Sequence, residues 1–343
     1  ELTDAELALA AREIASLRVP PRRGRPPEAI HALLRFAEEA RSPGGREALA
    51  GRTVVKLTVD LPLQRRVALA ARDSVTIWEK QGAGNAAVIV VDRKRNAIVA
   101  RVGSTRWADA EHAGAIDYAR VPRSPGSALK PFLYALALER GTITPATILP
   151  DLDRGAGGIT NADDIFLGPL LPRVALANSR NVPAADLLDR VGLAEGYAFL
   201  RDLGLHDGSI PVHRYGLGLA IGGLPVTLEG MVRAYSVLTN DGTLVEPLFW
   251  EGQPLPRPRR LLSEESARAV TLYLADPMAR LPSFPRMGVT EYPFPVAVKT
   301  GTSSRYRDAW TAAFSTRYLV AVWVGHPDFK PMNRLSGYRA AAE

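Results

Sequence analysis

The sequence predicts one mixed α/β domain whose antiparallel sheet is closed by both ends of the chain. Three observations predict it. Two strand-like runs form a hairpin pattern over residues 86–102, and a helical region with glycine and proline punctuation extends from 127 to about 280. Three further strand-like runs follow between 296 and 325. Strands on both sides of a helical region favour one shared sheet that is covered by helices.

The first 52 residues are predicted to form an interdomain arm, and residues 53–343 the domain itself. Residues 5–17 have helical spacing, and 19–27 form a basic, proline-rich linker. Residues 27–40 carry the apolar stripe of an amphipathic helix. The Ser-Pro-Gly-Gly run that follows is expected to end this helix.

Each element of the domain is predicted from its own local pattern. Residues 54–59 alternate as in a strand, 60–79 have the spacing of a long helix, and the polar turn 92–96 joins two apolar runs into a hairpin. Helices are predicted over 127–139, 184–191, 195–203, 227–239 and 263–274. Strands are predicted over 296–302, 309–315 and 318–325, the last two joined by a tight turn.

Composition excludes several classes of protein. With 46% hydrophobic and 23% charged residues the chain is ordinary for a globular protein, so disorder throughout is excluded. The cysteine count of zero excludes disulfides, thiolate metal sites and cysteine nucleophiles. The net charge of +7 comes mostly from scattered arginines without interleaved aromatics, so no nucleic-acid partner is expected.

Two further patterns argue against bound metals and cofactors. The five histidines lack metal-ligand spacing, so no metal site is expected. A glycine-rich run at 216–222 resembles a dinucleotide loop, but its third glycine comes one residue late and no strand clearly precedes it. The paired carboxylates Asp163 and Asp164 are interpreted as a solvated turn.

No apolar run approaches the roughly 18 residues that are needed to span a bilayer. The chain begins at Glu1 without a signal-type segment. We therefore expect an excised fragment, with any membrane anchor outside this sequence.

A serine and a lysine lie one helical turn apart at the start of the helix predicted over 127–139. Ser127 and Lys130 share one face within hydrogen-bonding reach. Unpaired N–H groups at a helix start favour a developing negative charge, and a lysine acts as base once burial or a nearby cation lowers its pKa. Ser127 is the candidate nucleophile and Lys130 its candidate base. An N-cap serine with a solvated lysine is the alternative interpretation of this motif alone.

A second serine precedes an asparagine by two residues. Ser179 and Asn181 point the same way only in an extended or turn conformation. Pro183 biases Val182 away from the helical region, which fits a short turn between helices just after Asn181. An ordinary serine/asparagine turn is the alternative interpretation.

A third motif, Lys299-Thr300-Gly301-Thr302, ends the strand predicted over 296–302. The lysine supplies a point charge for a carboxylate, the two threonines supply hydroxyls, and the glycine lets a substrate backbone approach closely. These four residues are candidate ligands of an anionic peptide end. A strand that runs into a glycine-containing turn is the alternative.

The three motifs together form the signature of penicillin-recognising serine acyltransferases. Ser127 precedes Ser179 by 52 residues, and Ser179 precedes Lys299 by 120. Lysine occurs only six times in the chain, yet two of the six fall inside these motifs. The combination therefore favours catalysis over the alternatives that each motif allows alone.

The chain resembles the transpeptidase domain of class A penicillin-binding proteins. The segments that carry the resemblance are 58–64, 123–132, 175–184, 215–223 and 299–310, the last of which resembles the 1C type in particular. The resemblance covers roughly residues 53–340. It implies a five-stranded antiparallel sheet between helices with a mostly helical second lobe, as in serine β-lactamases, an active site at their junction, and a final helix near 336–343.

The resemblance also implies roles for the motif residues. Ser127 would attack the penultimate D-Ala carbonyl of a D-Ala-D-Ala stem peptide, Lys130 would take its proton, and Ser179 would relay a proton to the leaving amine. Asn181 would hold the substrate amide and orient Lys130. Lys299, Thr300 and Thr302 would hold the terminal carboxylate, and backbone N–H groups of Ser127 and Thr302 would form the oxyanion hole.

Partners and location follow from the same resemblance. It implies stem peptides as donor and amine acceptor, β-lactams as acylating mimics of the donor, and other cell-wall synthesis proteins as candidate partners. It places the domain on the periplasmic side of the bacterial inner membrane. The glycosyltransferase domain of full-length class A proteins is not present in this sequence, and no cofactor is expected.

Two other functions stay open at this point. In a DD-carboxypeptidase or a β-lactamase, water replaces the acceptor amine. No glutamate-containing deacylation segment of the class A β-lactamase type occurs between Ser127 and Lys299, so slow deacylation is expected. A β-lactam sensor that is acylated without turning over peptides would use the same residues.

Overall fold

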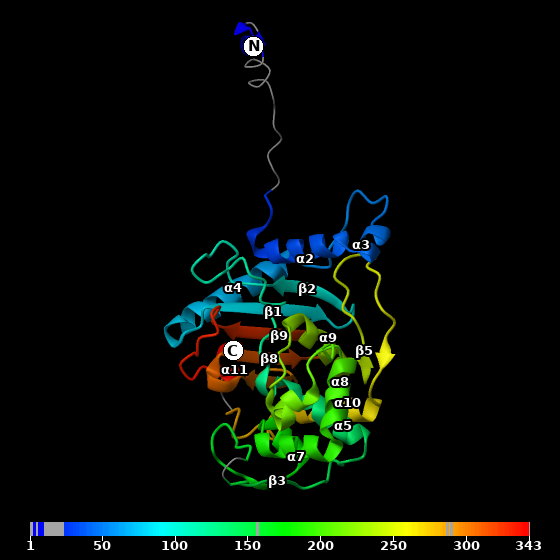
Figure 1. Ribbon diagram of the computed structural model, residues 1–343, viewed down its shortest axis with the longest axis vertical. Helices are drawn as coiled ribbons and strands as arrows, with labels where there is room; N and C mark the ends of the chain where they lie inside the picture. Colours follow the sequence, from blue (N-terminus) through cyan, green and yellow to red (C-terminus); the bar gives the residue numbers. More distant parts are fainter. Residues whose placement is uncertain are drawn as a thin grey trace.

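A five-stranded antiparallel sheet runs through the middle of the molecule, with strand order β2-β1-β9-β8-β7 (Figure 1). The computed structural model describes residues 3–4, 6–9, 24–155, 158–285, 288 and 291–342. The sheet joins the hairpin of the first part of the chain to the three strands of the last part, as predicted. Its strands are β1 (Asn85–Asp92), β2 (Ala97–Val102), β7 (Ala297–Thr302), β8 (Asp308–Phe314) and β9 (Tyr318–Gly325).

The helices between β2 and β7 form the predicted second lobe beside the β8 side of the sheet (Figure 1). These helices are α5 (Lys130–Glu139), α6 (Pro172–Ala177), α7 (Asn181–Val191), α8 (Leu193–Asp202), α9 (Leu228–Thr239) and α10 (Glu264–Ala275). Two short two-stranded sheets lie in the same region: β3 (Leu149–Asp151) with β4 (Gly168–Leu170), and β5 (Thr243–Leu244) with β6 (Arg259–Arg260).

Three of the predicted helices begin at a side chain that caps them. Asp60 accepts a hydrogen bond from the Leu63 N–H at the start of α4 (Leu61–Trp78). Thr227 caps α9 in the same way, and Ser263 caps α10. Each cap satisfies a backbone donor that has no partner inside its helix, and each lies at or next to the helix start that the sequence predicts.

Two apolar cores fill the two faces of the sheet. One lies between the sheet and the helical lobe, and α9 and α10 contribute to it. The other lies under α4 and α11 (Gly337–Ala341) on the opposite face. In α4 the buried stripe is Gln64, Ala68, Ala71 and Val75, which has the spacing of a helix with one covered side. The sheet is therefore covered by helices on both faces.

The segment before residue 53 packs onto the domain from Pro27 onward. Ala32 of α2 (Ile30–Arg41) is fully buried and belongs to a small apolar cluster with Phe249 and Trp250. α3 (Pro43–Ala48) follows α2. The helix expected over 5–17 falls largely outside the described residues, and the domain boundary at residue 52 stays a prediction.

The strand expected at 54–59 is wrong. In the structure this segment forms only a single bridge, between Leu57 and Trp250. Thr58 holds it in place, because its hydroxyl donates to the Ile98 carbonyl at 2.6 Å. Alternation marked a half-buried extended segment that has no neighbouring strand to pair with along its length.

The helix that the resemblance implies near the end of the chain is α11, which packs on β8 and β7. Between α11 and α4 the sheet face carries an apolar groove of about 640 Å³. Val67 and Trp78 of α4 and Val320 and Val322 of β9 line it. This face of the sheet is thus covered by α4 and α11, with the groove between them.

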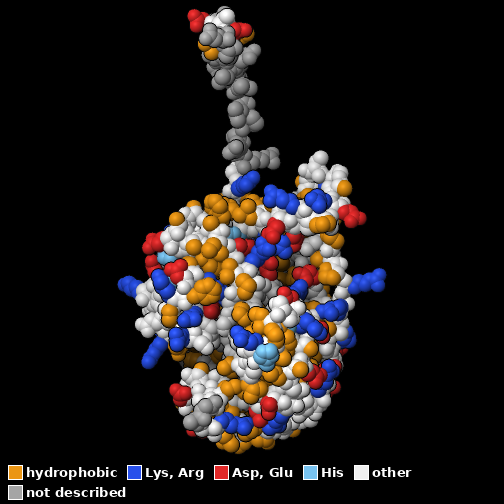
Figure 2. Space-filling model, in the orientation of Figure 1, with side chains coloured by type: hydrophobic (Ala, Val, Ile, Leu, Met, Phe, Trp, Pro, Cys, Tyr) orange, Lys and Arg blue, Asp and Glu red, His pale blue; other side chains and the backbone are white. Residues whose placement is uncertain are grey.

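Charged side chains are distributed over the surface without a continuous basic stripe on the face seen in Figure 2, where Lys and Arg alternate with Asp and Glu. Among the helices in the described part of the chain, none has the length and apolar character to cross a membrane.

We expect Asp60→Ala to lower the free energy of unfolding by about 1 kcal/mol, because it removes the cap of α4. Urea denaturation with matched m-values measures this difference. The control is Asp73→Ala, which removes an exposed carboxylate from the interior of the same helix and should change stability by less than about 0.5 kcal/mol. Equal losses in both variants would contradict a capping role.

Candidate active site

Ser127 lies in a tight helical turn that leads directly into α5. This turn, η3 (Gly126–Leu129), begins after Pro125 and passes into the helix at Lys130. Ser127 is partly exposed, whereas Lys130 is fully buried. The Tyr235 hydroxyl of α9 donates a 2.8 Å hydrogen bond to the Ala128 carbonyl, which anchors the turn to the core. The candidate nucleophile is thus accessible on a fixed backbone.

The turn that carries Ser127 is packed backbone to backbone against the end of β7. A Cβ atom on Gly301 would lie 2.0 Å from the Pro125 carbonyl oxygen. A Cβ atom on Gly126 would lie 2.3 Å from the Thr302 carbonyl oxygen, and Gly126 has a φ of +54°. Both positions therefore require glycine. The sequence explained Gly301 by the approach of a substrate, but the observed neighbour is the protein's own nucleophile segment.

A third glycine contacts the same turn from the other side. A Cβ atom on Gly222 would lie 2.3 Å from the Cα of Gly126. Gly222 follows η5 (Gly216–Ile221), and its carbonyl accepts a 2.7 Å hydrogen bond from the Ser124 hydroxyl. The glycine-rich run that resembled a dinucleotide loop is thus a support for the nucleophile segment. Its sequence signal was the unusual glycine density itself.

Lys130 donates to two acceptors of the Ser179 turn. Its Nζ donates to the Asn181 Oδ1 at 2.7 Å and to the Ser179 carbonyl oxygen. Within the described residues no hydrogen bond joins Lys130 to the Ser127 hydroxyl, although the sequence placed the two within reach. The two acceptors hold the Lys130 amino group. A hydrogen bond between a nucleophile and its base often tightens only when substrate is bound.

Ser179 lies between the two lysines. Lys299 Nζ donates to the Ser179 hydroxyl at 2.7 Å and to the Thr300 carbonyl oxygen at 2.8 Å. Ser179 has a φ of +59°, a left-handed conformation that a serine adopts at a cost, and the turn it makes aims the carbonyl at one lysine and the hydroxyl at the other. The structure therefore brings Lys130, Ser179, Asn181 and Lys299 together.

The two lysines lie in an environment that disfavours their charged forms. Burial, followed by the positive charges of Lys299 and Arg180, lowers the pKa of Lys130 well below its ordinary value. Burial lowers the pKa of Lys299 to about 7. A neutral lysine amine can accept a proton, so Lys130 has the property that a base for Ser127 needs.

Thr302 is held by the last helix as well as by the sheet. Its Oγ1 accepts a 3.0 Å hydrogen bond from the Gly337 N–H at the start of α11, which leaves the hydroxyl hydrogen to donate elsewhere. Thr300 and Thr302 are both partly exposed, in contrast to the buried Lys299.

The sequence interpretation missed a buried ion network beneath the Ser179 turn. Arg180 is 5% exposed and pairs with the fully buried Asp151 and with Asp163, both at 2.8 Å. Asp163 lies in an exposed turn, as predicted, but it also pairs with Arg180, which the sequence did not indicate. A basic residue between the motif serine and asparagine was the available signal, but its partners come from a distant loop.

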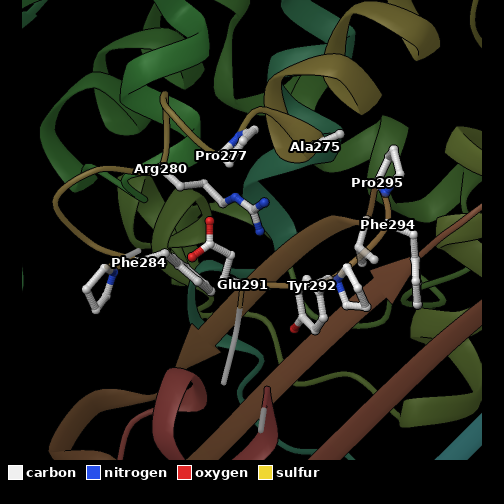
Figure 3. Close-up of a pocket in the computed structure, with 11 residues that line it drawn as sticks. Ala275, Pro277, Arg280, Phe284, Glu291, Tyr292, Phe294 and Pro295 are labelled. Atoms are coloured by element: carbon white, nitrogen blue, oxygen red, sulfur yellow. The ribbon is translucent and has the colours of Figure 1, made fainter. Parts of the chain in front are cut away.

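A pocket of about 360 Å³ opens on the segment that joins α10 to β7 (Figure 3). Arg280 points into it beside the ring of Phe284, and its guanidinium lies 5.6 Å from the ring centroid. The same segment is tied to the residue before Ser179, because the Asn178 side chain donates to the Ala279 carbonyl at 2.7 Å. This pocket therefore adjoins the Ser179 turn without containing any motif residue.

Among the described residues, no group of three or more His, Asp and Glu side chains is placed to hold a metal ion. The chemistry of the site is that of a serine with two lysines, a second serine and an asparagine.

Comparison with known protein families shows which family this chain belongs to. Residues 86–333 match the model of the penicillin-binding protein transpeptidase domain. The chain belongs to this transpeptidase family. It is 35% identical over 297 residues to penicillin-binding protein 1C of Escherichia coli K12, which agrees with the resemblance to the 1C type. It is 32% identical over 279 residues to penicillin-binding protein 1A of Aquifex aeolicus. These matches cover 84% and 74% of this chain but only 37% and 36% of those relatives.

Solved structures of penicillin-binding proteins share the fold. The penicillin-binding protein PonA1 of Mycobacterium tuberculosis superposes with a TM-score of 0.70 at 20% identity, covering 92% of this chain and 89% of that chain. Penicillin-binding protein 1A of Haemophilus influenzae gives 0.61 at 24% identity, covering 75% and 46%. The predicted arrangement of a five-stranded sheet with helices is confirmed by the structure and by these neighbours.

We expect the stability of this transpeptidase domain to rise between pH 7 and pH 9 more steeply than that of a Lys299→Met variant. The folded state lowers the pKa of Lys299 from 10.5 to about 7, so in this range the unfolded chain binds more protons than the folded chain. Stability then increases with pH, and the penalty of a charged Lys299 is fully present only below pH 7. Urea midpoints at pH 7, 8 and 9 measure the effect. Parallel pH curves for the two proteins would contradict it.

Proposed function

We propose that this chain is a peptidoglycan DD-transpeptidase domain, which cross-links stem peptides through a Ser127 acyl-enzyme and is acylated by β-lactams. The observation that carries the proposal is the meeting of Lys130, Ser179, Asn181 and Lys299 at the end of one edge strand, against which the turn that carries Ser127 is packed. Family membership supplies the reaction class, and this arrangement supplies the groups that the reaction needs.

In the proposed acylation step, Ser127 Oγ attacks the penultimate D-Ala carbonyl and Lys130 takes the hydroxyl proton. The lowered pKa of Lys130 supports this role, because burial and the neighbouring Lys299 and Arg180 favour the neutral amine, which is the form that accepts a proton. The carbonyl oxygen becomes an oxyanion that the N–H groups of Ser127 and Thr302 would stabilise. The contact of Gly126 with the Thr302 backbone supports this pair, since it holds the two segments side by side.

The scissile amide then breaks, and the terminal D-Ala leaves as an amine. Ser179 would deliver the proton to that amine, a role supported by its position between the two lysines. Lys299, Thr300 and Thr302 would hold the carboxylate of the departing D-Ala, and Gly301 keeps the strand next to the nucleophile. Asn181 would hold the donor's amide while it orients Lys130.

The acyl-enzyme would then react with the amine of a neighbouring stem peptide, which releases Ser127 and forms the cross-link. Transfer to water instead would make the domain a DD-carboxypeptidase, and a long-lived acyl-enzyme without peptide turnover would make it a β-lactam sensor. The chain spans about a third of the length of the curated relatives it matches. We propose that it acts on the periplasmic side of the inner membrane, with the anchor and a glycosyltransferase domain outside this sequence.

We expect Ser127→Ala to abolish labelling by a fluorescent penicillin, because no other group in the site would replace the attacking hydroxyl. The loss should exceed about a thousandfold in acylation rate. In-gel fluorescence against wild type measures it. Ser209→Ala, which removes an exposed serine hydroxyl outside the three motifs, is the control that should still label. Undiminished labelling of the Ser127 variant would show that the nucleophile lies elsewhere.

We expect the penicilloyl label on the wild-type chain to persist for hours, because no glutamate-containing deacylation segment occurs between the first and third motifs. The label is followed after excess antibiotic is removed, with a rapidly hydrolysing serine β-lactamase beside it for comparison. Loss within minutes would instead identify a β-lactamase.

A further inference from the structure

We propose that Asn161 and Arg180 are positioning residues for acylation, which hold the side-chain amide of Asn181 where it receives Lys130. The inference rests on the proposed function, because it concerns the same acylation step. Neither residue contacts Ser127 in the structure. They act through the backbone and side chain of Asn181, by fixing the loop between β3 and β4 against the start of α7.

Arg180 makes three directed contacts from a buried position. Its Nε donates to the Asp151 Oδ2 at 2.8 Å, and its Nη1 donates to the Asp163 Oδ2 at 2.8 Å. Its Nη2 donates to the Ile165 carbonyl oxygen. The planar fork of a guanidinium matches three acceptors in fixed directions, which a lysine cannot do. Arg180 lies between the motif residues Ser179 and Asn181, so these contacts attach the β3–β4 loop to the Ser179 turn.

Asn161 carries this attachment to Asn181. Its Nδ2 donates to the other oxygen of Asp151, at 2.6 Å. Its Oδ1 accepts from the Asn181 N–H at 2.8 Å, at the first position of α7. Asn161 is 3% exposed, so these hydrogen bonds form away from water and are costly to leave unmade. The buried carboxylate of Asp151 thus accepts hydrogen bonds from both positioning residues.

The Asn181 side chain is held at both ends of its amide. Its Nδ2 donates to the Thr160 carbonyl at 3.0 Å, next to Asn161 in the loop, and its Oδ1 faces the Lys130 Nζ at 2.7 Å. The loop contact decides which end of the amide points at the lysine, because only the NH₂ end can donate to a carbonyl. If the loop moves away, the amide loses this orientation and Lys130 loses an acceptor.

The charges around Lys130 agree with this arrangement. The groups that act on it are the cations Lys299 and Arg180 and the carboxylate of Asp151. Arg180 pairs with Asp151 at 2.8 Å, so it offsets a carboxylate that would otherwise raise the pKa of Lys130. Asp163 lies at the more exposed end of the network, with its side chain 48% exposed.

A double-mutant cycle tests the proposal. Acylation by a chromogenic or fluorescent β-lactam is measured for the 343-residue chain and for Asn161→Ala, Asn181→Ala and the double variant. We expect Asn161→Ala to slow acylation about tenfold in the wild-type background, and by less than about twofold when Asn181 is already alanine. An equal factor in both backgrounds would show that Asn161 acts independently of Asn181 and would overturn the proposal. So would an unchanged rate in Asn161→Ala alone.

Variants of Arg180 separate the effect of its hydrogen-bond geometry from the effect of its positive charge. Arg180→Lys keeps the charge and loses the fork, so it should slow acylation about as much as Asn161→Ala. Acylation at the wild-type rate in this variant would contradict the role of the fork. Asp163→Asn, at the exposed end, should slow acylation only a few-fold and keeps the test open if Arg180→Lys does not fold. Acylation as slow as in Asn161→Ala would show that Asp151 does not anchor the network.

The matched control is Arg154→Ala. Arg154 lies on the same loop and pairs with Asp186 of α7 at 3.1 Å, but its own side chain is 48% exposed, whereas Arg180 is buried. Acylation of this variant should stay within about twofold of wild type. A loss equal to that of Asn161→Ala would show that any loosening of the loop slows acylation, and would overturn a specific role.

The two proposals fail in different ways. If Ser127→Ala still labels, the assignment of the nucleophile fails and the cycle has no bearing on Lys130. If Ser127→Ala is inactive and the cycle is additive, only the positioning role fails. Thermal unfolding of each variant shows whether it is folded at the assay temperature.

Discussion

The site depends on a backbone contact that leaves no room for side chains. The turn that carries Ser127 lies between Gly301 of β7 and Gly222 of the η5 segment, and at each contact a Cβ atom would come within 2.3 Å of backbone. Backbone atoms cannot rotate away as side chains do, so this contact sets the position of Ser127 relative to the sheet. The location of the lysines and of the Ser179 turn follows from that placement.

The same packing forces two lysines into one buried volume. Two like charges that are shielded from water repel each other strongly. A fixed set of hydrogen-bond acceptors satisfies the two amino groups: the carbonyls of Ser179 and Thr300, the Ser179 hydroxyl and the Asn181 amide. A turn in the left-handed region at Ser179 is what makes two of these acceptors face different lysines. Strain, burial and reactivity are therefore properties of one short turn.

Much of the fold was predictable because its signals are local. Cap residues such as Thr227 and Ser263 identify helix starts, and short apolar runs such as residues 86–91 mark strands that lie between two cores. The motif residues were predictable because their order and chemistry are specific. The segment at 54–59 was wrongly predicted as a strand because alternation indicates burial on one side of a segment and not the presence of a partner strand. The ion network could not be predicted, since Arg180 and Asp151 meet only through the path of a long loop.

The position of β7 at the rim of the sheet has a consequence for the behaviour of the protein in solution. A free edge presents unpaired backbone groups to any extended chain, and edges of this kind promote aggregation. Here the edge is short: Pro293 and Pro295 precede the strand, and η6 (Ser304–Tyr306) ends it. An edge of six residues is long enough to pair with a short peptide, but it is too short for stable pairing with the sheet of a second molecule.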